Sequence, residues 1–128
     1  MSNRRRAATN NRYRSSFLRS PAWFARRDRW FREEEAAGKS LHCFGCGRTE
    51  TKRHLELHHL DYDGVIETDK GWLAQEAHED LISMHPRCHE LLHRILDRDA
   101  VYGSLRDRRH ASLMALARLR QKLERTAE

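Results

Sequence analysis

Residues 85–93 read HPRCHELLH, and this short stretch decides how the chain is expected to fold. Pro86 near its start and the apolar spacing after it predict a helix over residues 86–97. His89 and His93 are four positions apart, so on a helix they share one face and can hold one ion. Cys88 lies about 100° around the helix from His89. The helix is therefore expected to carry two metal sites on different sides.

A second cysteine pair lies upstream, in a glycine-rich turn sequence that contains Cys43 and Cys46. Cys43-x-x-Cys46 and His85-x-x-Cys88 each place two ligands so that one turn aims both at one ion. Two such turns complete the tetrahedral shell of a structural Zn²⁺. His42 is an alternative to His85 as the fourth ligand. Zinc would also supply free energy of folding to a chain whose core is small.

His58 and His59 stand between Leu57 and Leu60, in a segment that predicts a short strand. Adjacent residues on a strand point to opposite faces, so both histidines cannot bind one ion while the strand is regular. This favours one of them as a metal ligand beside the helical histidines. The other is then a candidate base, since a neutral imidazole accepts a proton near pH 7.

The segments around these motifs predict further helices. Ser20-Pro21 is a helix start and Gly38 a stop, and four aromatic residues between them are expected in the core: Trp23, Phe24, Trp30 and Phe31. Residues 61–79 are expected to form a polar, acidic loop or hairpin with Trp72 and Leu73 as its packing points. A last helix follows Gly103-Ser104, and its apolar stripe consists of Leu116, Leu119 and Leu123.

The net charge of +6 is unevenly distributed along the chain of 128 residues. Residues 1–32 carry +9, residues 33–100 carry −7 and residues 101–128 carry +4. Basic ends favour a polyanionic partner, because each lysine or arginine that contacts a phosphate releases counterions. A solvated basic tail and a mitochondrial transit peptide have the same composition as the arginine-rich start. No apolar run approaches the roughly 20 residues that a membrane span needs.

From Cys43 to His93 the chain resembles the HNH endonuclease family. The matching residues are Cys43-x-x-Cys46, then Leu57-His58-His59-Leu60-x-Tyr62, then Glu76-x-x-x-Asp80-Leu81, then His85-x-x-Cys88-His89-x-x-x-His93. Upstream, the lead-in of many phage and bacterial members is matched by Tyr13 and by Phe17-Leu18-x-Ser20-Pro21-x-Trp23. The resemblance implies an α+β fold: a small ββα-metal (His-Me finger) core with structural zinc knuckles, flanked by N- and C-terminal helices. We expect the chain to divide into a basic arm (1–19), a nuclease domain with the zinc site (20–97) and a basic amphipathic helix (98–128), of which the helix lies outside the resemblance.

The resemblance also implies a role for each matching residue. His59 would be the general base, and His58, His89 and His93 would hold a catalytic ion such as Mg²⁺, Mn²⁺, Ni²⁺ or Zn²⁺. Asp80 stands where the family usually has asparagine, and its extra negative charge can also join the metal shell. His85 stands where the family usually has cysteine, so the exact zinc shell stays open. The structural zinc ligands would be Cys43, Cys46, His85 and Cys88.

The implied activity is metal-dependent hydrolysis of DNA phosphodiester bonds, leaving a 5′-phosphate, with weak sequence preference. Double-stranded DNA would be held by the arm, through Arg4, Arg5, Arg6, Arg12 and Arg14. The expected location is cytoplasmic and nucleoid-associated, without membrane contact. Two alternatives stay open. One is a zinc-knuckle nucleic-acid-binding protein without catalysis, and the other is a nuclease subunit with protein partners in a phage or defence assembly.

Overall fold

Ser20 begins the first long helix of the structure, a computed structural model that describes residues 15–98 and 107–127. Its hydroxyl oxygen accepts a hydrogen bond from the backbone N–H of Trp23 (3.2 Å) and so caps helix α2 (Pro21–Ala36). The helix ends before Gly38, whose φ of 75° suits a residue without a side chain. The predicted helix between Ser20 and Gly38 is therefore confirmed.

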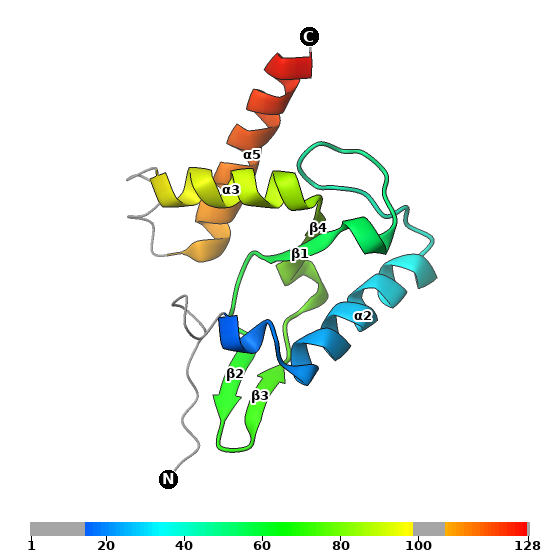
Figure 1. Cartoon of the computed structure of the whole chain (residues 1–128), viewed down its shortest axis with the longest axis vertical. Helices are drawn as coiled ribbons and strands as arrows, with labels where there is room; N and C mark the ends of the chain where they lie inside the picture. Colours follow the sequence, from blue (N-terminus) through cyan, green and yellow to red (C-terminus); the bar gives the residue numbers. More distant parts are fainter. Residues whose placement is uncertain (1–14, 99–106, 128) are drawn as a thin grey trace. The chain divides into compact units, whose positions relative to one another are not determined.

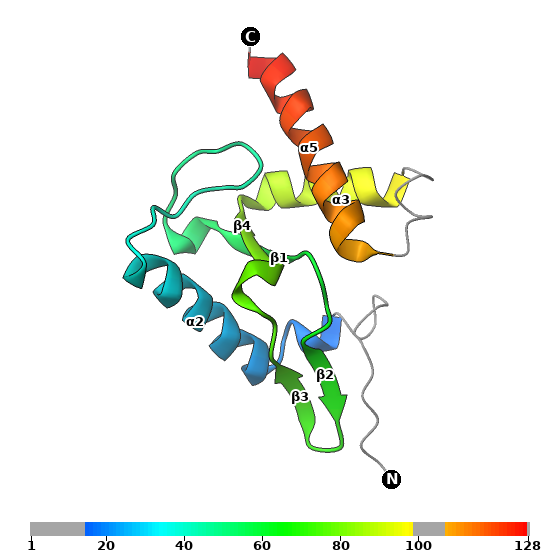
Figure 2. The same ribbon diagram turned by 180° about the vertical axis from the view of Figure 1, so that it is seen from behind.

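The described chain divides into two compact units, each made of two stretches of sequence. Unit 1 contains the residues up to Lys39 together with Asp61–Leu81. Unit 2 contains Ser40–Leu60 and the residues from Ile82 onward. The architecture is a small α+β fold with helices and two small antiparallel sheets, as Figures 1 and 2 show from opposite sides.

Unit 1 pairs α2 with a hairpin of strands β2 (Val65–Thr68) and β3 (Gly71–Ala74). The prediction that Leu73 is a packing point is wrong, because its side chain is 41% exposed. Trp72 turns toward Phe17, with ring centroids 5.5 Å apart, so its strand neighbour Leu73 points to the other face. The hairpin is buried instead at Val65 and Ile66.

The expected aromatic core of α2 is confirmed for three of its four members. Trp23, Trp30 and Phe31 are buried, whereas Phe24 is 53% exposed, so its assignment to the core is wrong. Phe24 lies near the start of the helix, about two turns before Phe31 on the same face. At that end of the helix no described part of unit 1 covers its ring.

Unit 2 contains the strands and helices on which the metal-ligand motifs stand. Strand β1 (Glu56–His59) pairs with β4 (Leu81–Met84). The first residue of β4, Leu81, is the last residue of unit 1, and the rest of the strand belongs to unit 2. Helix α3 (Pro86–Arg98) follows directly and packs against α5 (Arg108–Ala127). The predicted strand at His58-His59 and the predicted helix over 86–97 are confirmed.

Helix α5 confirms that the C-terminal part of the chain is helical, although residues 99–106 lie outside the described ranges. Leu116 and Leu119 of the predicted apolar stripe are buried, and Leu123 is half-buried. The arm residues Arg4, Arg5, Arg6, Arg12, Tyr13 and Arg14 also lie outside the described ranges. Within those ranges no helix is long and apolar enough to cross a membrane.

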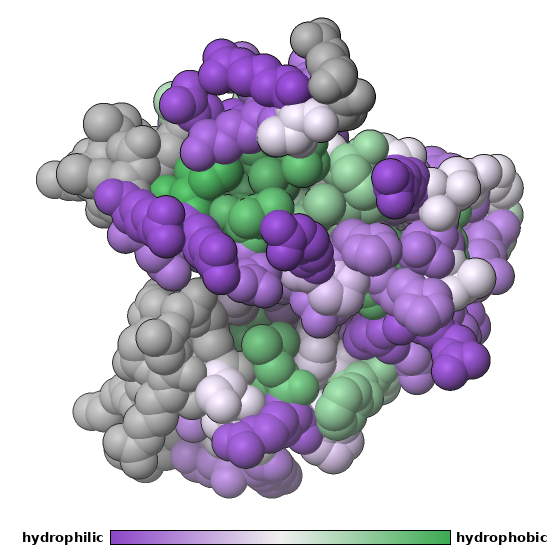
Figure 3. Space-filling view, turned by 45° about the horizontal axis from the view of Figure 1, so that its top comes forward, coloured by the Kyte–Doolittle hydropathy of each residue, from purple (hydrophilic) through white to green (hydrophobic). Residues whose placement is uncertain are grey.

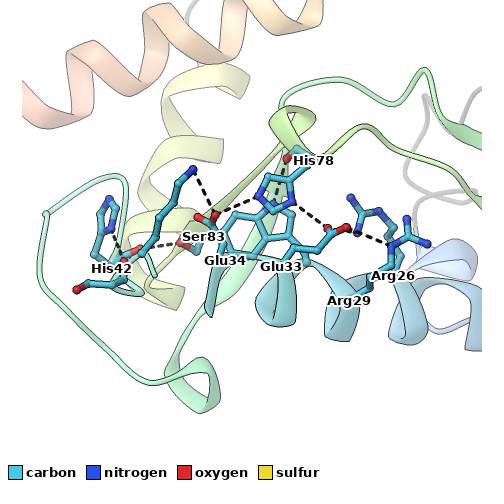
Figure 4. Close-up of polar contacts among 10 residues, drawn as sticks. Arg26, Arg29, Glu33, Glu34, His42, His78 and Ser83 are labelled. Carbon is cyan, nitrogen blue, oxygen red and sulfur yellow. Dashed lines mark hydrogen bonds and ion pairs between the residues drawn. The ribbon is translucent and has the colours of Figure 1, made fainter. Parts of the chain in front are cut away.

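The glycine-rich turn is attached to β4 by hydrogen bonds. The backbone N–H of Phe44 donates to the carbonyl oxygen of Ser83 (2.9 Å), and the Ser83 hydroxyl donates to the carbonyl oxygen of His42 (2.6 Å; Figure 4). Gly45 lies against α3 so closely that a Cβ there would be 3.1 Å from Cβ of Cys88. A glycine at this position therefore lets the turn approach the helix that carries Cys88.

Candidate metal centres

Three histidine rings from β1 and α3 converge in unit 2. Nδ1 of His58 lies 3.2 Å from Nε2 of His89, which in turn lies 3.1 Å from Nε2 of His93. One ring nitrogen from each histidine falls within 4.8 Å of the other two. Nitrogen ligands at 2.0–2.1 Å from a tetrahedral ion stand roughly 3.3 Å apart, close to these spacings. The set of histidines can therefore hold a metal ion, as the sequence predicted.

The ring nitrogens that point away from this cluster have partners of their own. Nδ1 of His89 lies 2.9 Å from a carboxylate oxygen of Glu56, and Nε2 of His58 lies 3.1 Å from the hydroxyl of Ser112. A partner on the outer nitrogen fixes which ring nitrogen carries the proton and how the ring is turned. Because the carboxylate of Glu56 can only accept, Nδ1 of His89 carries the proton and Nε2 of His89 is left free of hydrogen for a cation.

Glu56 and Ser112 are functional candidates that the sequence did not reveal. Glu56 stands two positions before His58 on the same strand, and that period-two spacing was a signal that could have drawn attention to it. Ser112 is fully buried on α5, more than fifty positions from His58 in sequence. No local pattern connects the two, because only the packing of α5 brings them together.

The electrostatic environment keeps His58 in the form that binds metals. The side chain is 1% exposed, and burial holds its pKa well below the ordinary value, helped by the nearby His89 and Arg108. A neutral imidazole has a lone pair to donate, whereas an imidazolium has none. The buried member of the cluster is therefore poised as a ligand at neutral pH.

The cysteines form a separate cluster. One sulfur atom from each of Cys43, Cys46 and Cys88 lies within 4.8 Å of the other two, and no histidine ring nitrogen is among the atoms of this set. Cys88 belongs to the cysteine cluster and its neighbour His89 to the histidine cluster. The prediction that α3 carries two sites on different sides is thus supported by the described ligand positions.

Backbone amides prepare Cys43 for a negative charge. Its sulfur accepts hydrogen bonds from the N–H groups of Gly45 (3.3 Å) and Cys46 (3.5 Å), and from that of His85. Burial by itself raises the pKa of the Cys43 thiol, but these donors outweigh it and the net pKa is lowered. A turn that stabilises a thiolate in this way suits a metal knuckle.

Cys88 has the opposite tendency. Burial, followed by the charge and hydrogen bonding of Cys43 and Cys46, raises its pKa to about 12. Three sulfurs this close cannot all be thiolates unless a cation compensates their charge. The donor set therefore fits a thiophilic divalent ion such as Zn²⁺.

The imidazole of His85 does not lie with the three sulfurs. Its Nε2 is 3.1 Å from a carboxylate oxygen of Glu50. The alternative ligand His42 stacks on Phe44 and its Nδ1 lies 3.1 Å from the carbonyl oxygen of Ser40. The structure thus brings together three of the four predicted zinc ligands, and the role of His85 stays a prediction.

His59, the predicted base, is 2% exposed at the end of β1. It is not part of the histidine cluster, in agreement with the alternation of side chains along a strand. Nε of Arg108 donates to its carbonyl oxygen at 3.2 Å, so α5 also anchors this end of the strand. No motif in the sequence points to Arg108.

Asp80 ends the 3₁₀ turn η2 (His78–Asp80) and is 8% exposed. It belongs to unit 1 and His59 to unit 2, so its predicted action beside the base stays a prediction. Unit 1 carries a histidine of its own in the same turn: His78 lies 3.0 Å from Glu33 and 3.1 Å from Glu34 of α2 (Figure 4).

Comparison with protein families, with curated proteins and with solved structures gives no match for this chain.

Proposed function

We propose that this protein is a metal-dependent endonuclease of the HNH type, with a ββα-metal core formed by β1, β4 and α3. The observation that carries the proposal is the convergence of His58, His89 and His93 on one point. These are the three residues that the resemblance assigns to the catalytic ion, and they come from two segments 31 positions apart in sequence.

Each of the chain's groups has a distinct part in this chemistry. His58, His89 and His93 would hold a divalent ion, which when bound neutralises charge on the phosphate and the leaving oxygen. His59, on the other face of β1, would accept the proton of the attacking water. An all-nitrogen donor set suits Zn²⁺ or Ni²⁺ better than Mg²⁺, which prefers oxygen. The arginine-rich arm would hold the DNA backbone.

The cysteines would hold a structural zinc ion that takes no part in cleavage. Cys43, Cys46 and Cys88 supply three thiolates, and a side-chain rotation of His85 away from Glu50 would supply the fourth ligand. A site closed by four protein ligands has no open position for water. Its contribution is to folding.

The decisive experiment is a plasmid-nicking assay with Mg²⁺, Mn²⁺, Ni²⁺ or Zn²⁺ and with EDTA. Wild-type protein should nick DNA with at least one metal, and EDTA should stop it. His59→Ala should lower the rate by about 10²–10⁴-fold, because the base acts only in the chemical step. His110→Ala removes an exposed histidine on α5 and is the matched control, with wild-type activity expected.

Binding and folding separate the base from the other groups. His59→Ala should keep the DNA affinity, the metal content and the melting temperature of the wild type. Cleavage by His59→Ala at the wild-type rate would refute the assignment of the base. If the metal-loaded wild type binds DNA but cleaves neither DNA nor RNA, the zinc-knuckle binding protein replaces the nuclease as the function.

A further inference from the structure

Helices α3 and α5 leave an apolar groove of about 580 Å³ between them. Its floor consists of aliphatic side chains: Leu91, Ile95, Leu119 and Leu123. Its rim carries cations from both helices: Arg87, Arg94 and Arg98 of α3, and Arg118 and Lys122 of α5. Figure 3 shows this arrangement as apolar surface bordered by hydrophilic side chains on two sides.

The groove continues a face that the fold already uses for packing. Along one face of α5, Ala111, Ala115 and Leu119 are buried in unit 2. One turn further along the same face, Leu123 is only half-buried, as are Leu91 and Ile95 on α3. The two helices are therefore prepared for a third element that would complete their apolar contact.

The charges of the rim decide which element fits. Among the described residues that line the groove, none is acidic. Arg94 pairs with Glu90, but within the described part of the chain Arg87, Arg98, Arg118 and Lys122 have no ion-pair partner. A cationic rim around an aliphatic floor is complementary to a helix with aliphatic residues on one face and carboxylates on both sides of it.

We propose that the groove between α3 and α5 is a docking site for an acidic amphipathic helix of a partner protein. Nucleic acid would satisfy the rim but would leave the aliphatic floor without apolar contacts. The chain's own arginine-rich arm and the same groove on a second copy carry the same charge as the rim and would be repelled.

Docking there is compatible with an accessible metal centre. On a helix of 3.6 residues per turn, the groove-lining positions of α3 lie about 160° around the axis from His89 and His93. A partner in the groove would therefore leave the histidine face of α3 uncovered. The proposal depends neither on a metal nor on catalysis, and it goes beyond the nuclease activity proposed above.

The test uses the full chain and a fluorescent 20-residue helical peptide with leucines at i, i+3, i+4 and i+7 spacing and glutamates beside them. Its affinity is measured by fluorescence anisotropy, and its site by the methyl NMR shifts of Leu91, Ile95 and Leu123. Leu123→Asp and Arg118→Glu should each weaken binding by about tenfold or more. Leu113→Asp and Arg125→Glu alter exposed positions of α5 outside the groove and should bind as the wild type does.

Three further ligands separate the possible occupants. The peptide with glutamine in place of glutamate should bind about tenfold more weakly, because it lacks the charge complement. The affinity for a 20-base-pair DNA duplex, and that for vesicles of anionic phospholipid, should be the same for the Arg118→Glu variant as for the Arg125→Glu variant. The proposal is overturned if the acidic peptide leaves the three methyl signals unmoved. It is equally overturned if Arg118→Glu weakens only duplex or vesicle binding, which would assign the rim to a polyanion.

Discussion

At the scale of single residues, the histidine cluster is organised by the groups behind it. Glu56 accepts a hydrogen bond from Nδ1 of His89 (2.9 Å), and the Ser112 hydroxyl lies within hydrogen-bond distance of Nε2 of His58 (3.1 Å). A ligand held in this way loses little conformational entropy when it binds a metal ion, because its free ring nitrogen already points toward the metal position. Such outer partners are therefore part of a metal site although they never touch the ion.

Glu56→Gln should lower the affinity of the cluster for Ni²⁺ or Zn²⁺ by about 10–100-fold. An amide is a weaker acceptor than a carboxylate and can present its NH₂ group to His89 instead. The measurement is competition titration with a chromogenic chelator, with the cysteine site kept loaded. Glu90→Gln, an exposed carboxylate on α3 that pairs with Arg94, is the control and should not change the affinity. Equal affinities for both variants would show that Glu56 has no positioning role.

At the scale of secondary-structure elements, α2 is tied to the turn η2 by a charged network rather than by apolar contacts alone. His78 stacks on Trp30, and its two ring nitrogens face Glu33 and Glu34 (Figure 4). The hydrogen bond from His78 lowers the pKa of Glu33, against the smaller opposing effect of burial. The interaction stabilises the folded state only while Glu33 is ionised.

The sign of the resulting pH dependence follows from the lowered pKa. Stability from Glu33 is fully present above its ordinary pKa of 4.5 and is lost as the pH falls through the lower folded-state pKa. Glu33→Gln should therefore lower the stability by about 0.2–1 kcal/mol at pH 6–7, and by less near pH 3, since the pair is partly exposed. Thermal melts across this pH range measure the effect. Glu35→Gln, on the exposed side of α2, should follow the wild-type profile.

At the scale of the whole molecule, the cysteine cluster connects two parts of unit 2 that are far apart in sequence. Cys43 and Cys46 lie on the turn held by β4, and Cys88 lies on α3. Gly45, between the two cysteines, contacts Leu119 of α5 as well as Cys88. An ion at this place would join the turn directly to α3, and β4 and α5 contact those two parts, so its removal should loosen unit 2 as a body.

Cys46→Ala should give a chain that has lost the zinc ion of the cysteine site and has a much lower melting temperature, because folding loses the free energy of metal binding. Hydrogen exchange should rise first in residues 40–60 and 82–98. His42→Ala removes a nearby histidine outside the sulfur cluster and should keep the zinc content of the wild type, as measured by mass spectrometry of the native protein. A well-folded Cys46→Ala protein without zinc would contradict the structural role of the site.

The sequence by itself determined the features that are encoded locally. Ser20-Pro21 and Gly38 marked the ends of α2. The helical spacing showed that His89 and His93 of α3 can share one ion and that Cys88 faces a different one. Capping and helical periodicity depend on neighbours within a few positions, and for that reason they can be read along the chain. The residue types and their spacing placed one histidine of 58 and 59 beside the helical pair, and the resemblance to a family chose His58 as that ligand.

Only the tertiary structure decided which groups surround those local features. Phe24 and Leu73 have the spacing or the hydropathy of core residues, yet they face away from the apolar contacts of unit 1. Ser112 behind His58, and the cationic groove beside Leu123, exist because α5 crosses α3 at one particular place. Contacts of this kind depend on how buried faces fit together over long sequence separations, and that fit is a property of the packed chain.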